Sequence, residues 1–298
     1  MSNPAPILAA VDFSPQARHA AQRAARVARH RACPLALLHV VPEAPLAQLH
    51  QLMGGNAAPG QWLLDDARRQ LSELAGSLAL AGAAPDCRAL VGPPVDEILR
   101  QAEATGAQLL VLGARGTSYL RRLVLGSTAE RLLRRSPRPL LVVRQTPHEP
   151  YRRALVAVDF SPWSTRCLEL AREVAPDAEL LLATVVQLPF EDKLRFAGID
   201  DASIQRYRQR ARHEALHRLD ALAQAAGLAP SRWRPCVLEG DPSLRIVETE
   251  QEHDCDLVVL GKHGVSAAVD LLLGSTTRHV LAEGTVDVLI ATAAAQAG

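Results

Sequence analysis

The chain has 298 residues, of which 48% are hydrophobic and 22% are charged, with a formal net charge of +1. This length fits two domains of about 150 residues better than one, and the near-balance of charge argues against a general affinity for nucleic acid or anionic membranes. Aromatic residues make up only 3% of the chain, which leaves little material for stacking nucleic-acid bases.

The expected elements alternate between strand and helix from the N-terminus onward. The run ILAAV predicts a strand that ends at Asp12, and Ser14 followed by Pro15 is typical of a helix start, with a hydroxyl at the N-cap and proline in the first turn. Further strands are expected at LALLHVV, DCRALVG, AQLLVLG and RPLLVVR, and helices over 61–81, over 93–104 and from Ser127. The strands are continuously apolar, which indicates burial on both faces and therefore an α/β fold with a doubly wound parallel sheet.

The second half of the chain repeats the first. ILAAVDFSP, which contains Asp12, returns as ALVAVDFSP, which contains Asp159, and AQLLVLGARG returns as CDLVVLGKHG. The spacing between equivalent residues stays nearly constant over a whole half, which indicates a duplicated domain. We therefore expect two tandem domains, at 1–146 and 151–294, joined by the short proline-bearing linker QTPHEPYRR.

A glycine motif follows the fourth expected strand of the first half. It consists of Gly113, Gly116, Gly126, Ser127 and Thr128. The first two glycines tolerate positive φ and carry no Cβ, so their amides can form a nest for an anion. A helix start after the third glycine adds unpaired N–H groups and the positive end of the helix dipole, and the two hydroxyls add donors. The motif therefore predicts a phosphate site that needs no lysine.

The second half carries the same spacing. Its residues are Gly261, Gly264, Gly274, Ser275 and Thr276. The residues between the glycines have diverged, from TSYLRRLVL to VSAAVDLLL, whereas the glycines have not, which favours phosphate binding. The alternative is that the glycines only form turns and the hydroxyls only cap helices, and Ser127 with Glu130 does have the spacing of a capping box.

A sheet in which the first and fourth strands of each half are neighbours would place the two aspartates beside these motifs. Asp12 and Asp159 each end the first strand of a half, and ligands of doubly wound sheets bind beyond the carboxyl ends of the strands. A carboxylate there can accept a hydrogen bond from a ribose hydroxyl. Each aspartate can also cap the turn before the following serine.

The pattern G-x2-G-x9-G-[ST], preceded by an aspartate at the end of the first strand, resembles the universal stress protein family, and both halves match it. The resemblance implies a five-stranded parallel sheet of order 3-2-1-4-5 in each half. It also implies ATP or another adenine nucleotide as ligand, with or without Mg²⁺, in those members that bind nucleotide. Asp12 and Asp159 would then lie by the adenine and ribose, Val41 and Val186 would contact the adenine, and the glycine motifs would hold the phosphates.

Two further expectations come from the same resemblance. Family members dimerise through strand five, so the strands over 139–144 and 286–291 would meet within one chain as a pseudo-dimer, and whole chains could pair further. Arg115 and, in the equivalent position, His263 are expected near the phosphate tail. His263 and its neighbour Lys262 could also simply face water. The second half departs from the first at Arg278, which stands where the first half has the glutamate of the capping box.

One motif points elsewhere. HEALH, at 213–217, fits the HExxH pattern of zinc proteases. However, His213 and His217 fall nearly opposite the apolar stripe of the expected helix from Ser203, and no third ligand is evident nearby. That stripe would comprise Ile204, Tyr207, Ala211, Ala215, Leu219 and Leu222. We therefore expect solvent-facing histidines and no metal site.

The remaining features bound the function. The five cysteines show no CxxC spacing, which suits reduced, inert thiols in a cytoplasm. No signal peptide and no apolar run of about 20 residues are present, so no membrane span is expected. No P-loop lysine or arginine finger is evident, so the protein would be at most a weak ATPase. The expected function is a cytoplasmic stress protein that binds adenine nucleotide. The alternatives are an interaction module without nucleotide and an ATP-using enzyme whose signature motifs are lacking.

Overall fold

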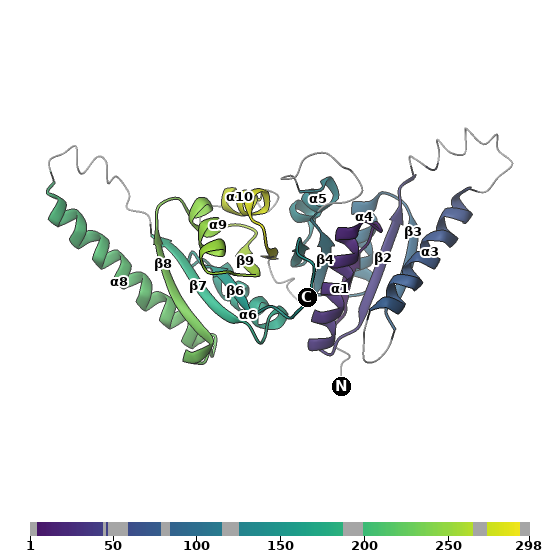
Figure 1. Cartoon of the computed structure of the whole chain (residues 1–298). Helices are drawn as coiled ribbons and strands as arrows, with labels where there is room; N and C mark the ends of the chain where they lie inside the picture. Colours follow the sequence, from purple (N-terminus) through teal and green to yellow (C-terminus); the bar gives the residue numbers. More distant parts are fainter. Residues whose placement is uncertain are drawn as a thin grey trace. The chain divides into compact units, whose positions relative to one another are not determined.

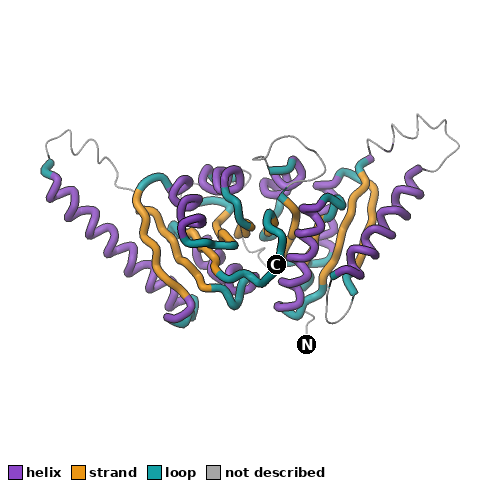
Figure 2. The backbone as a smooth tube through the Cα atoms, in the orientation of Figure 1, coloured by secondary structure: helices purple, strands orange, loops and turns teal. Residues whose placement is uncertain are grey.

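The computed structural model describes residues 5–43, 46, 59–78, 84–114, 125–186, 199–264 and 273–292. The chain divides into two units, and strands alternate with helices in each (Figure 2). The first unit combines Met1–Pro150 with Thr285–Gly298, and the second is Tyr151–Gly284. The last strand of the chain thus belongs to the first unit.

The first unit is built on a parallel sheet (Figure 1). Its elements are β1 (Ile7–Ala10), α1 (Pro15–His30), β2 (Leu35–Val41), α3 (Pro59–Ser77), β3 (Asp86–Val91), α4 (Pro94–Ala104), β4 (Leu109–Gly113), α5 (Ser127–Arg135), β5 (Leu140–Val143) and β10 (Asp287–Ala291). The strand order β3-β2-β1-β4-β5 confirms the predicted order 3-2-1-4-5. All four contacts between these five strands are parallel, as the continuous apolar runs predicted.

Helix α1 packs closely on this sheet. It begins as predicted, because the Ser14 hydroxyl accepts the Ala17 amide at 3.2 Å and Pro15 follows the cap. The face that contacts β1, β4 and β5 is rich in alanine. Its buried alanines are Ala17, Ala20, Ala21, Ala24, Ala25 and Ala28. Small side chains bring the helix backbone close to the strands, which sets the start of α1 directly beside the carboxyl ends of β1 and β4.

Strand β10 extends the first sheet with reversed direction. It pairs antiparallel with β5, with Val288 opposite Val142, Leu289 opposite Leu141 and Ile290 opposite Leu140. The predicted meeting of 139–144 with 286–291 is thereby confirmed.

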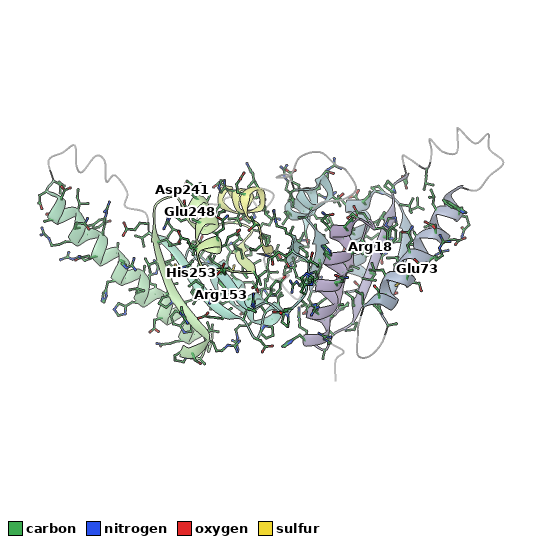
Figure 3. All side chains as sticks on the ribbon, in the orientation of Figure 1. Arg18, Glu73, Arg153, Asp241, Glu248 and His253 are labelled. Carbon is green, nitrogen blue, oxygen red and sulfur yellow. The ribbon has the colours of Figure 1, made fainter. Side chains whose placement is uncertain are left out.

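The second unit repeats the first in its order of elements. They are β6 (Arg153–Ala157), α6 (Pro162–Val174), β7 (Glu179–Val186), α8 (Asp201–Ala225), the 3-10 helix η1 (Pro230–Arg232), β8 (Trp233–Glu239), α9 (Pro242–Glu252), β9 (Leu257–Gly261) and α10 (Ser275–Glu283). The strands are parallel in the order β8-β7-β6-β9, which is the 3-2-1-4 part of the predicted sheet. Asp241 caps α9 by accepting the amides of Ser243 at 2.8 Å and Leu244 at 3.2 Å (Figure 3).

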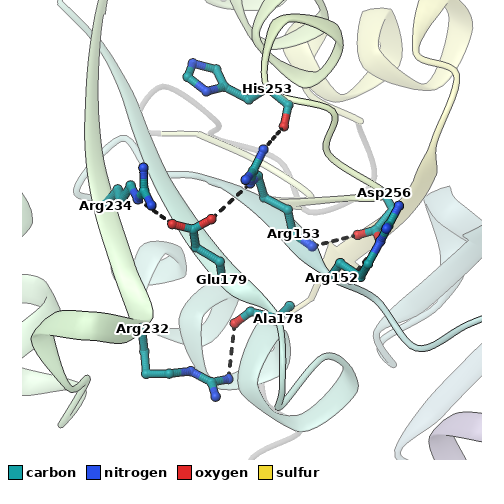
Figure 4. A network of polar contacts seen from close by, with 8 residues as sticks. All are labelled: Arg152, Arg153, Ala178, Glu179, Arg232, Arg234, His253 and Asp256. Carbon is teal, nitrogen blue, oxygen red and sulfur yellow. Dashed lines mark hydrogen bonds and ion pairs between the residues drawn. The ribbon is translucent and has the colours of Figure 1, made fainter.

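Ion pairs join the amino ends of the strands in the second unit (Figure 4). Glu179, the first residue of β7, accepts from Arg153 of β6 at 3.1 Å and also pairs with Arg234 of β8. Asp256, just before β9, accepts the amides of Arg152 at 2.7 Å and Arg153 at 3.1 Å. Ligands of such sheets bind at the opposite, carboxyl ends of the strands. We therefore assign this network to holding the sheet together.

Candidate functional site

The first unit has a cavity of about 370 Å³ at the carboxyl ends of β1, β2 and β4 and at the start of α5. This volume lies within the range of small-molecule sites, about 300–1,000 Å³. Among the lining residues are five that the sequence predicted: Asp12, Gly113, Gly126, Ser127 and Thr128. The apolar part of the lining includes Val11, Leu38, Val40, Ile98 and Leu112. Asp12 and four of the five residues of the glycine motif thus line the same cavity.

Asp12 is held in place by the residues that follow it. Its Oδ1 accepts the Ser14 hydroxyl at 2.6 Å and the Ser14 amide at 3.1 Å. Between them, Phe13 has a φ of 63°, which is strained for a residue with a bulky side chain. Such strain is concentrated at functional sites, and Phe160 repeats it in the second unit with a φ of 60°. The turn-capping and ligand-binding interpretations of Asp12 are therefore compatible.

The first glycine of the motif is required for close packing. A Cβ on Gly113 would lie 2.9 Å from the backbone carbon of Gln16 and 3.0 Å from the backbone nitrogen of Ala17. Of the two expected properties, Gly113 uses the absence of a Cβ and not positive φ, because its φ lies outside that region. The first turn of α1 comes so close to the end of β4 that no side chain fits between them.

Helix α5 starts at Ser127 as predicted, but the Ser127 side chain does not cap it. The N-cap residue is Gly126, whose amide donates to the carbonyl of Ala114 at 2.9 Å, and Ser127 is the first helical residue. The predicted capping box of Ser127 with Glu130 is wrong, because no side chain caps the helix and Glu130 pairs with Arg134 at 2.5 Å. A helix start without a side-chain cap leaves first-turn N–H groups available to an anion.

Strand β2 contributes a residue that the sequence analysis missed. His39 lines the cavity, and its ring stacks on Phe13 with 4.4 Å between centroids. Its Nδ1 lies 2.7 Å from the carbonyl oxygen of Val11, and because a carbonyl only accepts, Nδ1 carries the proton. Burial lowers the pKa of His39, and the bond to Val11 and the charge of Asp12 partly oppose this effect.

The valine predicted to contact adenine lies next to the cavity wall. The described lining includes Val40 and Pro42 but not Val41, which is buried. Its counterpart Val186 ends β7 and is half-buried. The adenine contacts of both valines stay predictions. The same holds for Arg115 and Gly116, which lie outside the described residues.

The second unit holds its aspartate differently. Asp159 Oδ1 accepts the amide of Ser161 at 3.0 Å and the hydroxyl of Ser164 at 3.2 Å. Ser161 is the N-cap of α6 and Pro162 follows it, as at Ser14 and Pro15, but the Ser161 hydroxyl makes no cap hydrogen bond. Ser164, whose hydroxyl donates to Asp159, stands where the first unit has Ala17.

The residues after β9 lie close to Asp159. A Cβ on Gly264 would come within 2.9 Å of Asp159 Oδ2, and one on Gly261 within 3.1 Å of Trp163 Cβ. Lys262 and His263 are both 7% exposed, so the expectation that they could face water is wrong. The His263 ring lies 6.3 Å from that of Trp163. In this unit, the protein's own residues pack around the glycine motif.

Helix α10 begins like α5. Its N-cap is Gly274, which has no side-chain cap and whose amide donates to the carbonyl of Lys262 at 3.0 Å, so Ser275 and Thr276 are the first helical residues. Thr277 then donates its hydroxyl to the carbonyl of Gly261 at 2.8 Å. The helix start is thereby tied to the end of β9, as expected for a shared site.

The HEALH segment lies on α8, where the rings of His213 and His217 are exposed with 2.9 Å between their Nε2 atoms. The helix starts at Asp201, capped by Asp200, two residues before the predicted Ser203. The predicted stripe fails at Tyr207, which is 48% exposed. Among the described residues, no group of three His, Cys, Asp or Glu side chains is placed to hold a metal ion.

The two units differ in how well they suit a nucleotide. The first cavity combines apolar walls, a carboxylate and an uncapped helix start, which are the groups that a base, a ribose and phosphates require. In the second unit, one carboxylate oxygen of Asp159 is bonded within the protein and the other faces Gly264. The residues of the first unit therefore fit an adenine nucleotide, whereas in the second unit both carboxylate oxygens of Asp159 lie against the protein's own residues.

Comparisons with known proteins agree with the duplicated fold. A family model described as the universal stress protein family matches residues 5–144 and again 150–292. Universal stress protein Mb2028c of Mycobacterium bovis is 28% identical over 301 residues, covering 96% of each chain. Universal stress protein Rv1636 of Mycobacterium tuberculosis is 34% identical over 142 residues, which are 47% of this chain and 95% of that protein.

A solved structure shows the same fold. The crystal structure of a universal stress protein from Archaeoglobus fulgidus DSM 4304 has a TM-score of 0.64 and 19% identity, covering 96% of this chain and 98% of that one. None of the helices in the described ranges combines the length and apolar character that a membrane crossing needs.

Proposed function

The chain belongs to the universal stress protein family, and we propose that its first unit binds ATP or another adenine nucleotide, with or without Mg²⁺, in the cavity at Asp12. The observation that carries the proposal is the convergence of Asp12, Gly113, Gly126, Ser127 and Thr128 on that one cavity. Its apolar walls include Val11 just after β1, Leu38 and Val40 of β2, Ile98 of α4 and Leu112 of β4.

Each part of the cavity has a role in binding. The Asp12 carboxylate, oriented by Ser14, accepts from a ribose hydroxyl. The amides at the start of α5 and the hydroxyls of Ser127 and Thr128 donate to phosphate oxygens. Val11 and Val40 provide apolar surface for the base. Amides and hydroxyls hold phosphates without activating water, so we expect binding with at most slow hydrolysis.

Titration calorimetry tests the proposal. Protein stripped of bound nucleotide by unfolding and refolding is titrated with ATP, with and without Mg²⁺, at tens of micromolar protein. The informative variant is Gly126→Asp. Aspartate is a favourable N-cap and should preserve α5, whereas its charge repels phosphate. We expect this variant to lose binding at the first unit.

The matched control is Gly274→Asp, which makes the same change at the start of α10. We expect it to leave binding at Asp12 intact. Absence of heat with the unmodified protein, or equal affinity in the Gly126→Asp variant, would refute the proposal. The first of these results would favour the alternative of an interaction module without nucleotide. A cytoplasmic role in stress physiology is the context we propose for the bound state.

A further inference from the structure

A buried ion pair lies where β10 joins the first sheet. Arg23 of α1 donates from Nε to Asp287 Oδ2 at 3.2 Å, and the two side chains are 4% and 0% exposed. The pair connects residues 264 positions apart in the chain. Charged side chains are rarely buried so completely, and their removal from water is costly unless each has a partner.

The pair is part of a larger set of hydrogen bonds. Asp287 is the first residue of β10, and its Oδ1 accepts the amides of Arg144 at 2.8 Å and Gln145 at 3.0 Å, just beyond β5. The Nη1 of Arg23 donates to the carbonyl of Glu149 at 2.9 Å. The Asp287 carboxylate thereby accepts two amides just beyond β5, and the Arg23 guanidinium connects α1 to Glu149 in the linker between the repeats.

The strand pairing around this ion pair is nearly symmetric. Leu141 and Leu289 are equivalent residues of the two repeats, and they lie opposite each other. On either side of this central pair, Val142 faces Val288 and Leu140 faces Ile290, so each position is paired with the repeat of the position on the other side of the centre. Apolar strands this similar would also be compatible with pairing of β5 with β5, or of β10 with β10, between two chains.

The ion pair is not symmetric. The repeat of Arg23 is Leu170, which follows Pro162 at the same distance that Arg23 follows Pro15. The repeat of Asp287 is Pro139, just before β5. Each charge thus occurs in one half only, and each equivalent position in the other half carries a buried uncharged residue.

We propose that the Arg23–Asp287 pair selects β10 as the partner of β5 and rejects the β5 of a second copy of this chain. In a β5–β5 pairing, Pro139 of the second copy would take the place of Asp287. The Arg23 guanidinium would then be buried without the Asp287 carboxylate, and the amides of Arg144 and Gln145 would lose this acceptor. A β10–β10 pairing would bury Asp287 without the Arg23 guanidinium. Only β5 with β10 brings these two charges together.

Cysteine cross-linking distinguishes the two pairings in the full-length protein. Leu141→Cys places one thiol at the centre of β5, which faces Leu289 in the native pairing and another residue 141 in a β5–β5 dimer. Arg23→Leu is introduced beside it. This substitution removes the Arg23–Asp287 ion pair from the native pairing. It also removes the cost of burying the Arg23 guanidinium away from Asp287 in a β5–β5 pairing. We expect disulfide-linked dimer to increase at least about tenfold on oxidation, in proportion to protein concentration.

Matched variants control for other effects. Arg23→Leu without the added cysteine should give no such dimer, which excludes the native thiols. Arg23→Lys keeps the charge and should stay close to the background of Leu141→Cys alone. If the leucine variant does not fold, Asp287→Asn with Leu289→Cys tests the reciprocal β10–β10 pairing. A monomer by light scattering, with no cross-link in either charge-removing variant, would overturn the proposal.

Discussion

Oxygen Oδ2 of Asp159 lies 2.9 Å from the position that a Cβ on Gly264 would take. A methyl group there must displace the carboxylate, whose other oxygen holds Ser161 and Ser164. We expect Gly264→Ala to cost about 1 kcal/mol of stability through these hydrogen bonds. In an Asp159→Ala background the obstacle is gone, so the same substitution should cost little. Denaturant unfolding of the four proteins measures the coupling, and strictly additive effects would contradict this interpretation.

Gly113→Ala should be more damaging, because its Cβ would meet backbone atoms of Gln16 and Ala17 that no rotamer change can move. We expect a loss of about 1–3 kcal/mol together with weaker nucleotide binding at the first unit. Gly76, inside α3, is the control, since nothing lies within 4 Å of its added Cβ. Gly76→Ala should stabilise the protein by about 0.5–1 kcal/mol. Thermal unfolding compares the two, and equal effects would refute the close-packing account.

The two N-cap serines should respond differently to alanine. Ser14 accepts the Ala17 amide and donates to Asp12, so Ser14→Ala should cost about 1 kcal/mol. The hydroxyl of Ser161 is buried and has no hydrogen-bond partner among the described residues. Ser161→Ala should therefore be neutral or slightly stabilising. A larger loss for Ser161→Ala in urea unfolding would contradict the cap geometry.

His39 should make stability fall on acidification. Burial lowers its pKa in the folded state, whereas the pKa of a histidine in an unfolded chain is about 6.5. The unfolded chain therefore takes up the proton first, and the stability that neutral His39 contributes is lost as the pH falls below that value. His39→Asn retains a donor for Val11 and cannot titrate. Urea midpoints at pH 7.5 and 5.5 should differ less in this variant, and an unchanged difference would refute the assignment.

Two thiols should resist alkylation in the folded protein. Burial raises the pKa of Cys167 and of Cys255 to about 12, which leaves a thiolate fraction of about 10⁻⁴ at pH 8. Cys33 is only half-buried, and burial raises its pKa as well. Iodoacetamide labelling followed by peptide mass spectrometry should modify the half-buried thiols of Cys33, Cys87 and Cys236 before those of Cys167 and Cys255. Rapid labelling of Cys167 without denaturant would show that this part of α6 opens readily.

The α/β class and the parallel direction of the strands were predictable because they follow from short-range patterns, whereas the strand order was implied by the family resemblance. Continuous apolar runs that alternate with helical segments indicate a parallel sheet whatever the rest of the chain does. Parallel strands bring their carboxyl ends to one edge, so the meeting of Asp12 with Gly113 could be expected from the sequence. The start of α1 at Ser14 and Pro15 was predictable for the same reason, since a cap depends on a few neighbouring residues.

Other features depend on distant packing. Which residues of β2 line the cavity depends on packing at the end of the strand. His39 and Val40 line the wall in place of Val41, and the His39 ring stacks on Phe13. Ser127 looked like a cap, but the helix start bonds to Ala114 through the Gly126 amide. The burial of Lys262 and His263 likewise depends on tertiary packing, because the neighbouring Gly264 lies against Asp159.

The duplication, the α/β class and the residues expected at the carboxyl ends of the strands could be read from the sequence alone, because these follow from local patterns repeated along the chain. The burial of two charges where β10 joins β5 became evident only from the folded structure. Arg23 and Asp287 carry no local signal of their pairing, since the free energy of a buried ion pair depends on partners that folding brings together from opposite ends of the chain.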